Sequence, residues 1–225
     1  MENLFGGRPE AAPPDLGALG RPLPDGLELD LAFAWPLLES YAGEAGTAES
    51  DCAWSVFGHY RLAAVAAVAA ARAAEADPAT AEFDLLAGAA LRHVADSVWQ
   101  AGRWLAEAFD LRLSPRVRPD PGGRELTGRL MFLDPALGSA LQERRIWLGD
   151  IAGIGRRVAQ GPVTFREGGS DRVPGPIGRA PVAEALRDHL EELDGFLRAV
   201  AAAIERHSAA GGRPREEVDE AWLND

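Results

Sequence analysis

The four histidines are the side chains of this sequence best suited to metal binding or acid–base chemistry. These histidines are His59, His93, His189 and His207. Two of them precede an acidic residue by three positions, as His93/Asp96 and His189/Glu192. Residues three apart occupy adjoining positions on a helix, and inward-facing histidine–carboxylate pairs form metal sites in helical bundles. The sequence therefore raises the question of a metal site.

The helical positions of these two pairs argue against a shared metal site. His189 lies within the apolar stripe of its expected helix, whereas Asp96 lies nearly opposite the apolar stripe of its own helix. Both pairs therefore cannot face one cavity. We expect His189 to be a buried core residue, His93 to lie at the boundary of the core, and no metal ligands among these side chains.

Arginine supplies all 23 basic residues, because the chain contains no lysine. Three pairs of arginines stand eleven residues apart, close to three helical turns, so each pair lies on one side of its helix. The pairs are Arg61/Arg72, Arg92/Arg103 and Arg145/Arg156. Guanidinium groups bind carboxylates and phosphates through two hydrogen bonds, so the pattern is compatible with a site for a small anionic ligand. The alternative is that the arginines are solvated or paired with some of the 35 acidic residues.

Composition limits the classes of function that the chain can have. The absence of lysine, together with abundant alanine, glycine, proline and arginine, indicates a bacterial genome rich in G and C. The net charge of −12 argues against general binding to nucleic acids or anionic membranes. Cys52 is the only cysteine, which excludes an internal disulfide and a cysteine-based zinc site. No apolar run approaches 18 residues and the N-terminal residues lack a secretory pattern, so we expect a cytoplasmic protein.

A row of small residues at seven-residue spacing is the clearest structural signal in the sequence. The row consists of Ala81, Gly88, Ala95 and Gly102. It lies beside the apolar stripe of a helix expected at about 79–110, and the preceding residues 62–74 are mostly alanine. Such smooth surfaces allow helix axes to approach more closely than the usual separation of about 8–10 Å. We therefore expect close helix–helix contact, either within the molecule or with a second protein.

Helical periodicity and capping signals predict an all-α fold. We expect an antiparallel bundle of four to five helices, in which the Ala/Gly-rich helices pack closely. The expected helices span about 28–41, 48–76, 79–110, 136–160 and 181–208. Segments rich in proline and glycine predict long loops at about 112–124 and 161–180. We expect a single domain over 28–209, between a mobile arm at 1–27 and an acidic tail at 210–225, with both termini disordered.

The first functional hypothesis is a non-catalytic binding or protein-interaction module, whose partner is another protein or a second copy of the chain. Trp99 lies beside the row of small residues and between Arg92 and Arg103 along the helix. Aromatic and arginine side chains supply much of the binding energy at protein interfaces, so we expect these three residues to form the contact. The alternative is that the same surface packs inside the monomer.

The second hypothesis is a small helical-bundle enzyme or ligand-binding protein. Its pocket would lie beside His93, Trp104 and His189, and the loop at 161–180 would close over it with Phe165, Arg166 and Arg172. An anionic or metal-bound ligand would suit such a pocket. The sequence names no cofactor for either hypothesis.

One segment resembles a motif of the HEPN-type ribonucleases. These helical proteins carry an arginine followed four to six residues later by a histidine near a helix end. The segment Arg156-Arg-Val-Ala-Gln160-Gly has this form, with glutamine in the position of the histidine. The resemblance implies a degenerate HEPN-like helical fold that lacks the general acid–base histidine on which catalysis depends.

Overall fold

The computed structural model describes residues 33–41, 46–76, 81–113, 119–161, 163, 165, 172–175 and 178–211. Within these residues the chain forms seven helices and one short β-hairpin. The helices are α2 (Trp35–Tyr41), α3 (Ala48–Ala76), α4 (Ala81–Ala108), α5 (Arg124–Leu133), α6 (Pro135–Glu143), α7 (Arg145–Ala159) and α8 (Val182–Ala209), and the strands are β1 (Arg172–Gly175) and β2 (Gly178–Pro181). The predicted all-α fold of packed helices is confirmed, whereas the predicted number of four to five helices is wrong.

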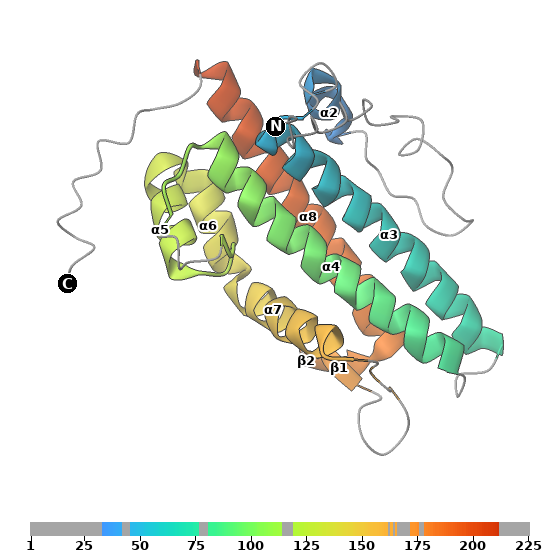
Figure 1. Cartoon of the computed structure of the whole chain (residues 1–225). Coiled ribbons are helices and arrows are strands. Elements are labelled where there is room, and N and C mark those ends of the chain that lie inside the picture. The colour runs from blue at the N-terminus through green and yellow to red at the C-terminus, as the bar shows by residue number, and fades with distance from the viewer. Residues whose placement is uncertain are drawn as a thin grey trace, which may run out of the picture.

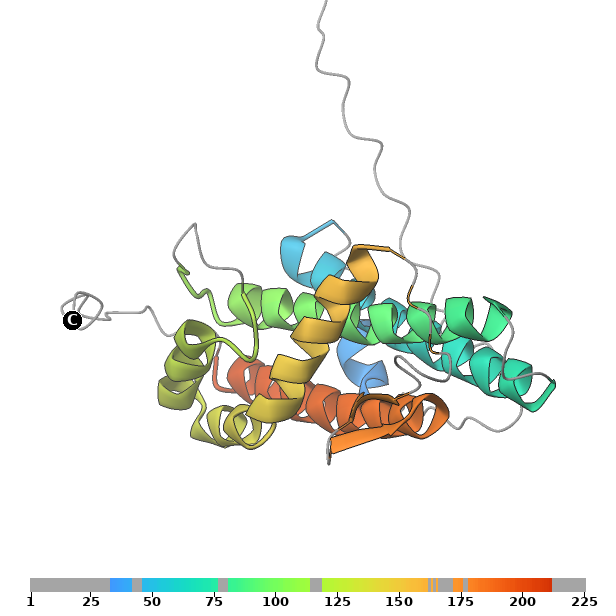
Figure 2. The same ribbon diagram turned by 90° about the horizontal axis from the view of Figure 1, so that it is seen from below.

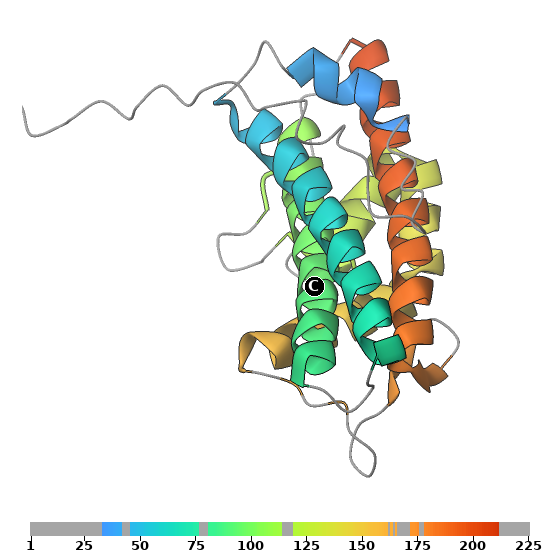
Figure 3. The same ribbon diagram turned by 90° about the vertical axis from the view of Figure 1, so that its right-hand side faces the viewer.

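Four longer helices form the body of the molecule (Figure 1). Helices α3 and α4 form an antiparallel pair and α8 lies against both (Figure 1), whereas α7 crosses α4, as the view of Figure 2 shows. Figure 3 shows α3, α4 and α8 side by side. The view from below in Figure 2 shows α5 and α6 near the start of α7 and the β1–β2 hairpin beside the start of α8.

One apolar core connects these helices, because a single cluster of buried side chains extends from α2 to α8. Its largest members include Phe57 of α3, Trp104 of α4 and Phe196 of α8. The Trp104 ring meets the rings of Tyr41 and Phe57 edge to face, at centroid distances of 6.1 and 5.9 Å. Its indole N–H donates a hydrogen bond to Tyr41 Oη, which holds α2 against α4. None of the described helices has the length and apolar character needed to cross a membrane.

The α3–α4 pair is built largely from small side chains, and it is the most extensive contact between any two elements. Ala53, Ala63 and Ala64 of α3 are fully buried. Ser97 of α4 donates a hydrogen bond to the backbone carbonyl of Val56 at 3.0 Å, a contact that requires the two helices to lie close together. The alanine-rich part of α3 therefore packs within the molecule.

The row of small residues on α4 is covered mainly by other parts of this chain. A Cβ atom at Gly155 of α7 would lie 2.8 Å from the Cβ of Ala95, so α7 crosses α4 at this point. A Cβ atom at Gly102 would overlap the carbonyl oxygen of Pro119. Gly88 is also buried, although a Cβ atom there would meet nothing within 4 Å, and the first member of the row is exposed. The row thus serves close contacts inside the molecule at its last two members, Ala95 and Gly102.

The helix expected at 136–160 is divided into α6 and α7 at Arg144, where the prediction of one helix is wrong. A Cβ atom at Gly138 of α6 would overlap the backbone of Met131, so α6 packs tightly on α5. Helix α7 instead crosses α4. Packing on α5 and packing on α4 require different helix directions, so the chain changes direction between α6 and α7. Arg144 lies at the change of direction and pairs with Glu192 of α8, with Nε 3.4 Å from Oε2.

Two segments outside the expected helices have regular structure. Residues 124–133, which follow the expected loop at about 112–124, form the helix α5. Strands β1 and β2 pair antiparallel within the expected loop at 161–180. Each strand has four residues, which is too short to show an alternating pattern. The expected arm at 1–27 and most of the expected tail at 210–225 lie outside the described residues.

Two glycines of α7 provide a matched test of the α4–α7 crossing. A Cβ at Gly153 would meet only Arg156 Nη2 at 4.0 Å, whereas a Cβ at Gly155 would lie 2.8 Å from that of Ala95. Alanine is favoured over glycine in helices by roughly 0.5–1 kcal/mol, so we expect Gly153→Ala to raise the free energy of unfolding by about that amount. Overpacking costs about 1–3 kcal/mol, so we expect Gly155→Ala to be less stable than Gly153→Ala. Urea unfolding followed by circular dichroism measures both, and equal stabilisation would contradict a close crossing.

Candidate functional site

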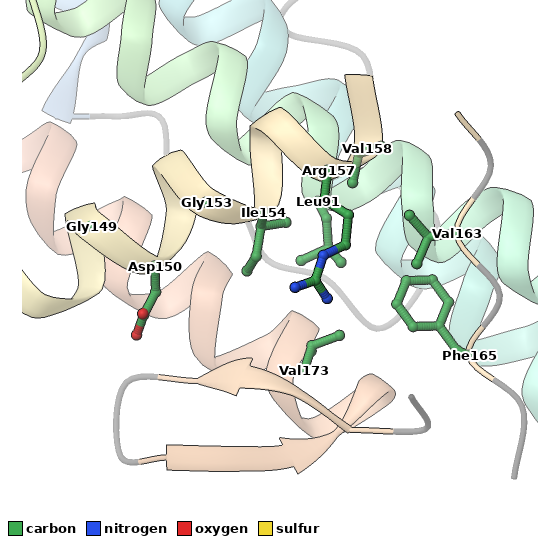
Figure 4. Close-up of a pocket in the computed structure, with 10 residues that line it drawn as sticks. All are labelled: Leu91, Gly149, Asp150, Gly153, Ile154, Arg157, Val158, Val163, Phe165 and Val173. Atoms are coloured by element: carbon green, nitrogen blue, oxygen red, sulfur yellow. The ribbon is translucent and has the colours of Figure 1, made fainter. Parts of the chain in front are cut away.

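A cavity of about 230 Å³ lies between α4, α7 and the β1–β2 hairpin (Figure 4). Apolar side chains form most of its wall, namely Leu91, Ile154, Val158, Val163, Phe165 and Val173. Gly149 and Gly153 leave part of the α7 side without side chains, and Asp150 and Arg157 add charge. The cavity is therefore mainly apolar with a small number of polar groups, as is common for small-molecule sites.

Residue spacing along α7 produces its side of the cavity. Gly149, Gly153 and Arg157 are four residues apart, and Asp150, Ile154 and Val158 repeat the same spacing one position later. Residues four apart lie above one another on a helix, so both rows face the same side. This side combines the two glycines with apolar and charged side chains.

The start of α7 is fixed against α8 by a buried hydrogen bond. Trp147 Nε1 donates to Nδ1 of His189 at 3.0 Å, and the Trp147 ring contacts that of Phe196 at a centroid distance of 6.0 Å. His189 is fully buried, as expected for a core residue. Since its Nδ1 atom accepts this hydrogen bond, a neutral His189 carries its proton on Nε2. The contact sets the position of the α7 wall.

The segment after α7 is held against the start of α4. Asp84 lies in the first turn of α4, and its Oδ1 accepts a hydrogen bond from the backbone N–H of Phe165 at 2.9 Å. A carboxylate is stabilised at this end of a helix by the helix dipole. The Phe165 ring also meets that of Phe83 edge to face at 6.5 Å. Part of the loop expected to act as a lid therefore forms a fixed wall of the cavity.

Arg157 and Asp150 are the charged side chains of the described wall. Figure 4 shows the Arg157 side chain extending from α7 towards the hairpin, whereas Asp150 lies further back along the helix. Within the described part of the chain, no carboxylate lies within 4.0 Å of the Arg157 guanidinium. Among the described residues, the cavity thus presents one cation, Arg157, to a bound molecule.

The structure does not bring together the three residues around which a pocket was expected. Trp104 is fully buried in the core, His189 is fully buried beside α7, and His93 is partly exposed beside α3. His93 and Trp104 are eleven residues apart, or about 16 Å along the helix axis, so they cannot line one small cavity. These side chains have separate surroundings.

The residues expected at a protein interface lie on an exposed side of α4. Trp99 is 41% exposed, and the guanidinium of Arg103 lies over its ring at 5.4 Å from the centroid. Arg92 pairs with Asp96 one turn further on, with Nε 3.7 Å from Oδ2. Trp99 is therefore accessible, and both neighbouring cations already have partners on the same helix.

His93 faces His59 of α3, and the two Nδ1 atoms lie 3.1 Å apart. Burial lowers the pKa of His93 below its ordinary value, and the neighbouring His59 lowers it further. Asp96 acts in the opposite direction, whereas Arg92 again lowers the pKa. Desolvation and the nearby positive charges therefore favour the neutral form of His93.

Apart from Phe165, which was expected in a loop over a pocket, sequence reasoning missed the residues of the cavity, and it missed the partner of His93. The two rows at four-residue spacing on α7 are visible in the sequence and could have indicated a special helix face. Leu91, Phe165 and Val173 come from three other segments, and no local pattern connects them. Likewise, His59 precedes His93 by 34 residues, and only the packing of α3 on α4 brings them together.

No family model matches this chain, and searches of curated proteins and of solved structures found no similar protein. The motif that resembles HEPN-type ribonucleases lies at the end of α7, where Arg156 and Gln160 are both exposed. Functional inference therefore depends on the geometry of the described side chains.

The lowered pKa of His93 predicts a pH dependence of stability. The unfolded chain binds the proton near the ordinary histidine pKa of about 6.5, and native His93 binds it only at lower pH. As pH falls below about 6.5 the unfolded state is therefore protonated first, and we expect the free energy of unfolding to decrease until native His93 is also protonated. Above about pH 7 this contribution is constant.

Histidine NMR titration measures the native pKa, and urea unfolding of the native chain and of the His93→Gln variant measures the effect on stability. We expect the variant to lose part of the decrease between about pH 6.5 and the native pKa of His93. A native pKa above 6.5, or the same pH dependence in both proteins, would be inconsistent with this electrostatic environment.

Proposed function

We propose that this chain is a non-catalytic binding protein of the bacterial cytoplasm, and that the cavity between α4, α7 and the hairpin binds a small carboxylate with an apolar body. The supporting observation is the guanidinium of Arg157 beside a wall formed largely by apolar side chains (Figure 4). A carboxylate can accept two parallel hydrogen bonds from a guanidinium. Its hydrocarbon part would replace water against the apolar wall, which is favourable.

The volume of the cavity limits the size of the proposed ligand. Sites for drug-sized molecules occupy about 300–1,000 Å³, whereas this cavity has about 230 Å³. Because a water molecule occupies roughly 30 Å³ in the liquid, the cavity has room for on the order of eight non-hydrogen atoms. Hexanoate has this size and combines one carboxylate with an unbranched apolar chain. It is therefore a suitable probe.

The distribution of charge favours a ligand with a single negative charge. The chain carries a net charge of −12, which repels polyanions such as nucleic acids. Asp150 lies on the same wall as Arg157 and would repel a second carboxylate placed near it. Both features support a monocarboxylate.

The composition of the wall supports binding rather than catalysis. Its described residues include one carboxylate and one guanidinium, and no cysteine, serine or histidine is among them. Nucleophilic catalysis generally needs a nucleophile beside a base. The described wall offers no such pair, so the proposed activity is reversible binding.

Isothermal titration calorimetry with hexanoate tests this proposal. Hydrogen bonds to charged groups contribute about 1.5–3 kcal/mol, so we expect Arg157→Gln to weaken binding by roughly 10- to 100-fold. Arg156→Gln is the matched control, because Arg156 is the neighbouring exposed arginine of α7 and is not among the residues that line the cavity. Gly153→Leu should fill the cavity and abolish binding.

Hexan-1-ol, which lacks the carboxylate, should bind at least about 10-fold more weakly than hexanoate. The proposal fails if the native chain does not bind hexanoate, or if Arg157→Gln and Arg156→Gln weaken hexanoate binding to the same extent. It also fails if Gly153→Leu remains folded and binds as the native chain does.

A protein interaction through Trp99 is a second candidate function. The large Trp99 ring is 41% exposed, and Arg103 lies over it. Tryptophan and arginine are enriched among the residues that dominate binding energy at interfaces. This surface would serve a protein partner or a second copy of the chain.

Sedimentation velocity over a range of protein concentrations tests self-association through this surface. We expect a reversible dimer, and Trp99→Ala should weaken it by about 30-fold, which corresponds to about 2 kcal/mol at an interface residue of this kind. Leu85→Ala is the control, since Leu85 is a 70% exposed apolar residue of the same helix. A native chain that stays monomeric, or equal effects of the two substitutions, would contradict self-association through Trp99.

A further inference from the structure

Two histidines and one aspartate form a cluster on the α3–α4 pair that the proposed carboxylate site does not use. The cluster consists of His59 of α3 with His93 and Asp96 of α4, and each of the three residues is partly exposed. One ligand atom of each lies within 4.8 Å of the other two. In the part of the chain that the structure describes, no other group of three such residues is this close.

The separation of the two imidazoles matches that of two ligands on one metal ion. Their Nδ1 atoms are 3.1 Å apart. Zinc binds histidine nitrogen at about 2.0–2.1 Å with tetrahedral geometry, which places two such nitrogens roughly 3.3 Å from each other. The spacing of the two nitrogens is therefore close to that of two ligands on one ion.

The packing of α3 on α4 holds the cluster together. Ser97 lies next to Asp96 on α4 and is hydrogen-bonded to the carbonyl of Val56 on α3, which fixes the two helices at this level. Asp96 follows His93 by three residues, so both lie on adjoining positions of α4. Ligands placed on rigid helices in this way hold their geometry better than ligands on loops.

The carboxylate of the cluster also suits a cation. Asp96 contributes a negative charge, and its present partner is Arg92 at 3.7 Å. The Arg92 side chain is 60% exposed, and ion pairs at such positions contribute little to stability. A metal ion could therefore replace Arg92 as the partner of Asp96 at small cost.

We propose that His59, His93 and Asp96 bind one divalent transition-metal ion of the Zn²⁺ class, through the two Nδ1 atoms and one carboxylate oxygen. Three protein ligands leave a fourth tetrahedral position for water or an added ligand. The two nitrogen ligands favour Zn²⁺ over Ca²⁺ and Mg²⁺, which prefer oxygen ligands. Because the three residues are partly exposed, the ion can enter from solvent.

Calorimetric titration of the chelator-treated full chain with zinc chloride tests this site. We expect one Zn²⁺ ion per chain and no displacement by millimolar Ca²⁺. Loss of residues that only orient metal ligands costs about 10- to 100-fold in affinity, so His59→Gln and His93→Gln should each weaken binding by about 100-fold or more. Asp96→Asn should weaken it by at least about 10-fold.

His207→Gln is the matched control, because His207 lies on α8, where its ring stacks on Phe109. This variant should bind Zn²⁺ as the native chain does, and circular dichroism verifies that every variant is folded. Co²⁺ should bind with the visible absorption of a tetrahedral site. Hexanoate binding should be unchanged in His59→Gln, so the metal site and the proposed function fail or succeed separately.

Three results would overturn the metal site. The first is a native chain that takes up no stoichiometric Zn²⁺, which would leave a hydrogen bond between the two imidazoles as the role of the pair. The second is equal zinc affinity of the His59→Gln and His207→Gln variants. The third is equal competition by Ca²⁺, which would assign the binding to the acidic surface.

Discussion

The close antiparallel contact between α3 and α4 is the constraint on which the rest of the structure depends. Alanine and serine side chains allow the two helices to approach until Ser97 reaches the backbone of α3. Small side chains bury little apolar area, and hydrophobic stabilisation is roughly proportional to the area buried. The pair therefore depends on the large rings of Phe57 and Trp104 to fill the space between it and the other helices. The same pair carries the histidine cluster and contributes Leu91 to the cavity.

The long helices could be predicted because each buries one continuous stripe, and such a stripe leaves a period in the sequence. The predicted range 48–76 coincides with α3, and α8 begins and ends within one residue of the prediction. The break at Arg144 could not be predicted in this way, because the apolar period continues through it. It follows from tertiary contacts, since α6 packs on α5 whereas α7 crosses α4.

The candidate sites were less predictable than the helices because they depend on the register between elements. The sequence places Asp96 one turn after His93 on the same helix. In the structure, however, the ring of His93 faces that of His59 on another helix. A shift of α3 by one turn would move His59 by about 5.4 Å and would separate the two imidazoles. Periodicity carries no information about such a shift. The approach of Phe165 and Val173 to Leu91 depends in the same way on how the segments after α7 fold back.

The glycines of α7 differ in whether packing within the chain explains their missing side chain. Each glycine in a helix interior costs about 1 kcal/mol relative to alanine. Gly155 has a reason within the chain, because a side chain there would press on Ala95. Gly149 has no neighbour within 4 Å of a Cβ atom, and Gly153 has only the end of a flexible arginine side chain at 4.0 Å. Packing among the described residues therefore does not explain these two glycines. Both lie on the wall of the cavity, where a bound molecule would supply the contact that the chain itself does not make.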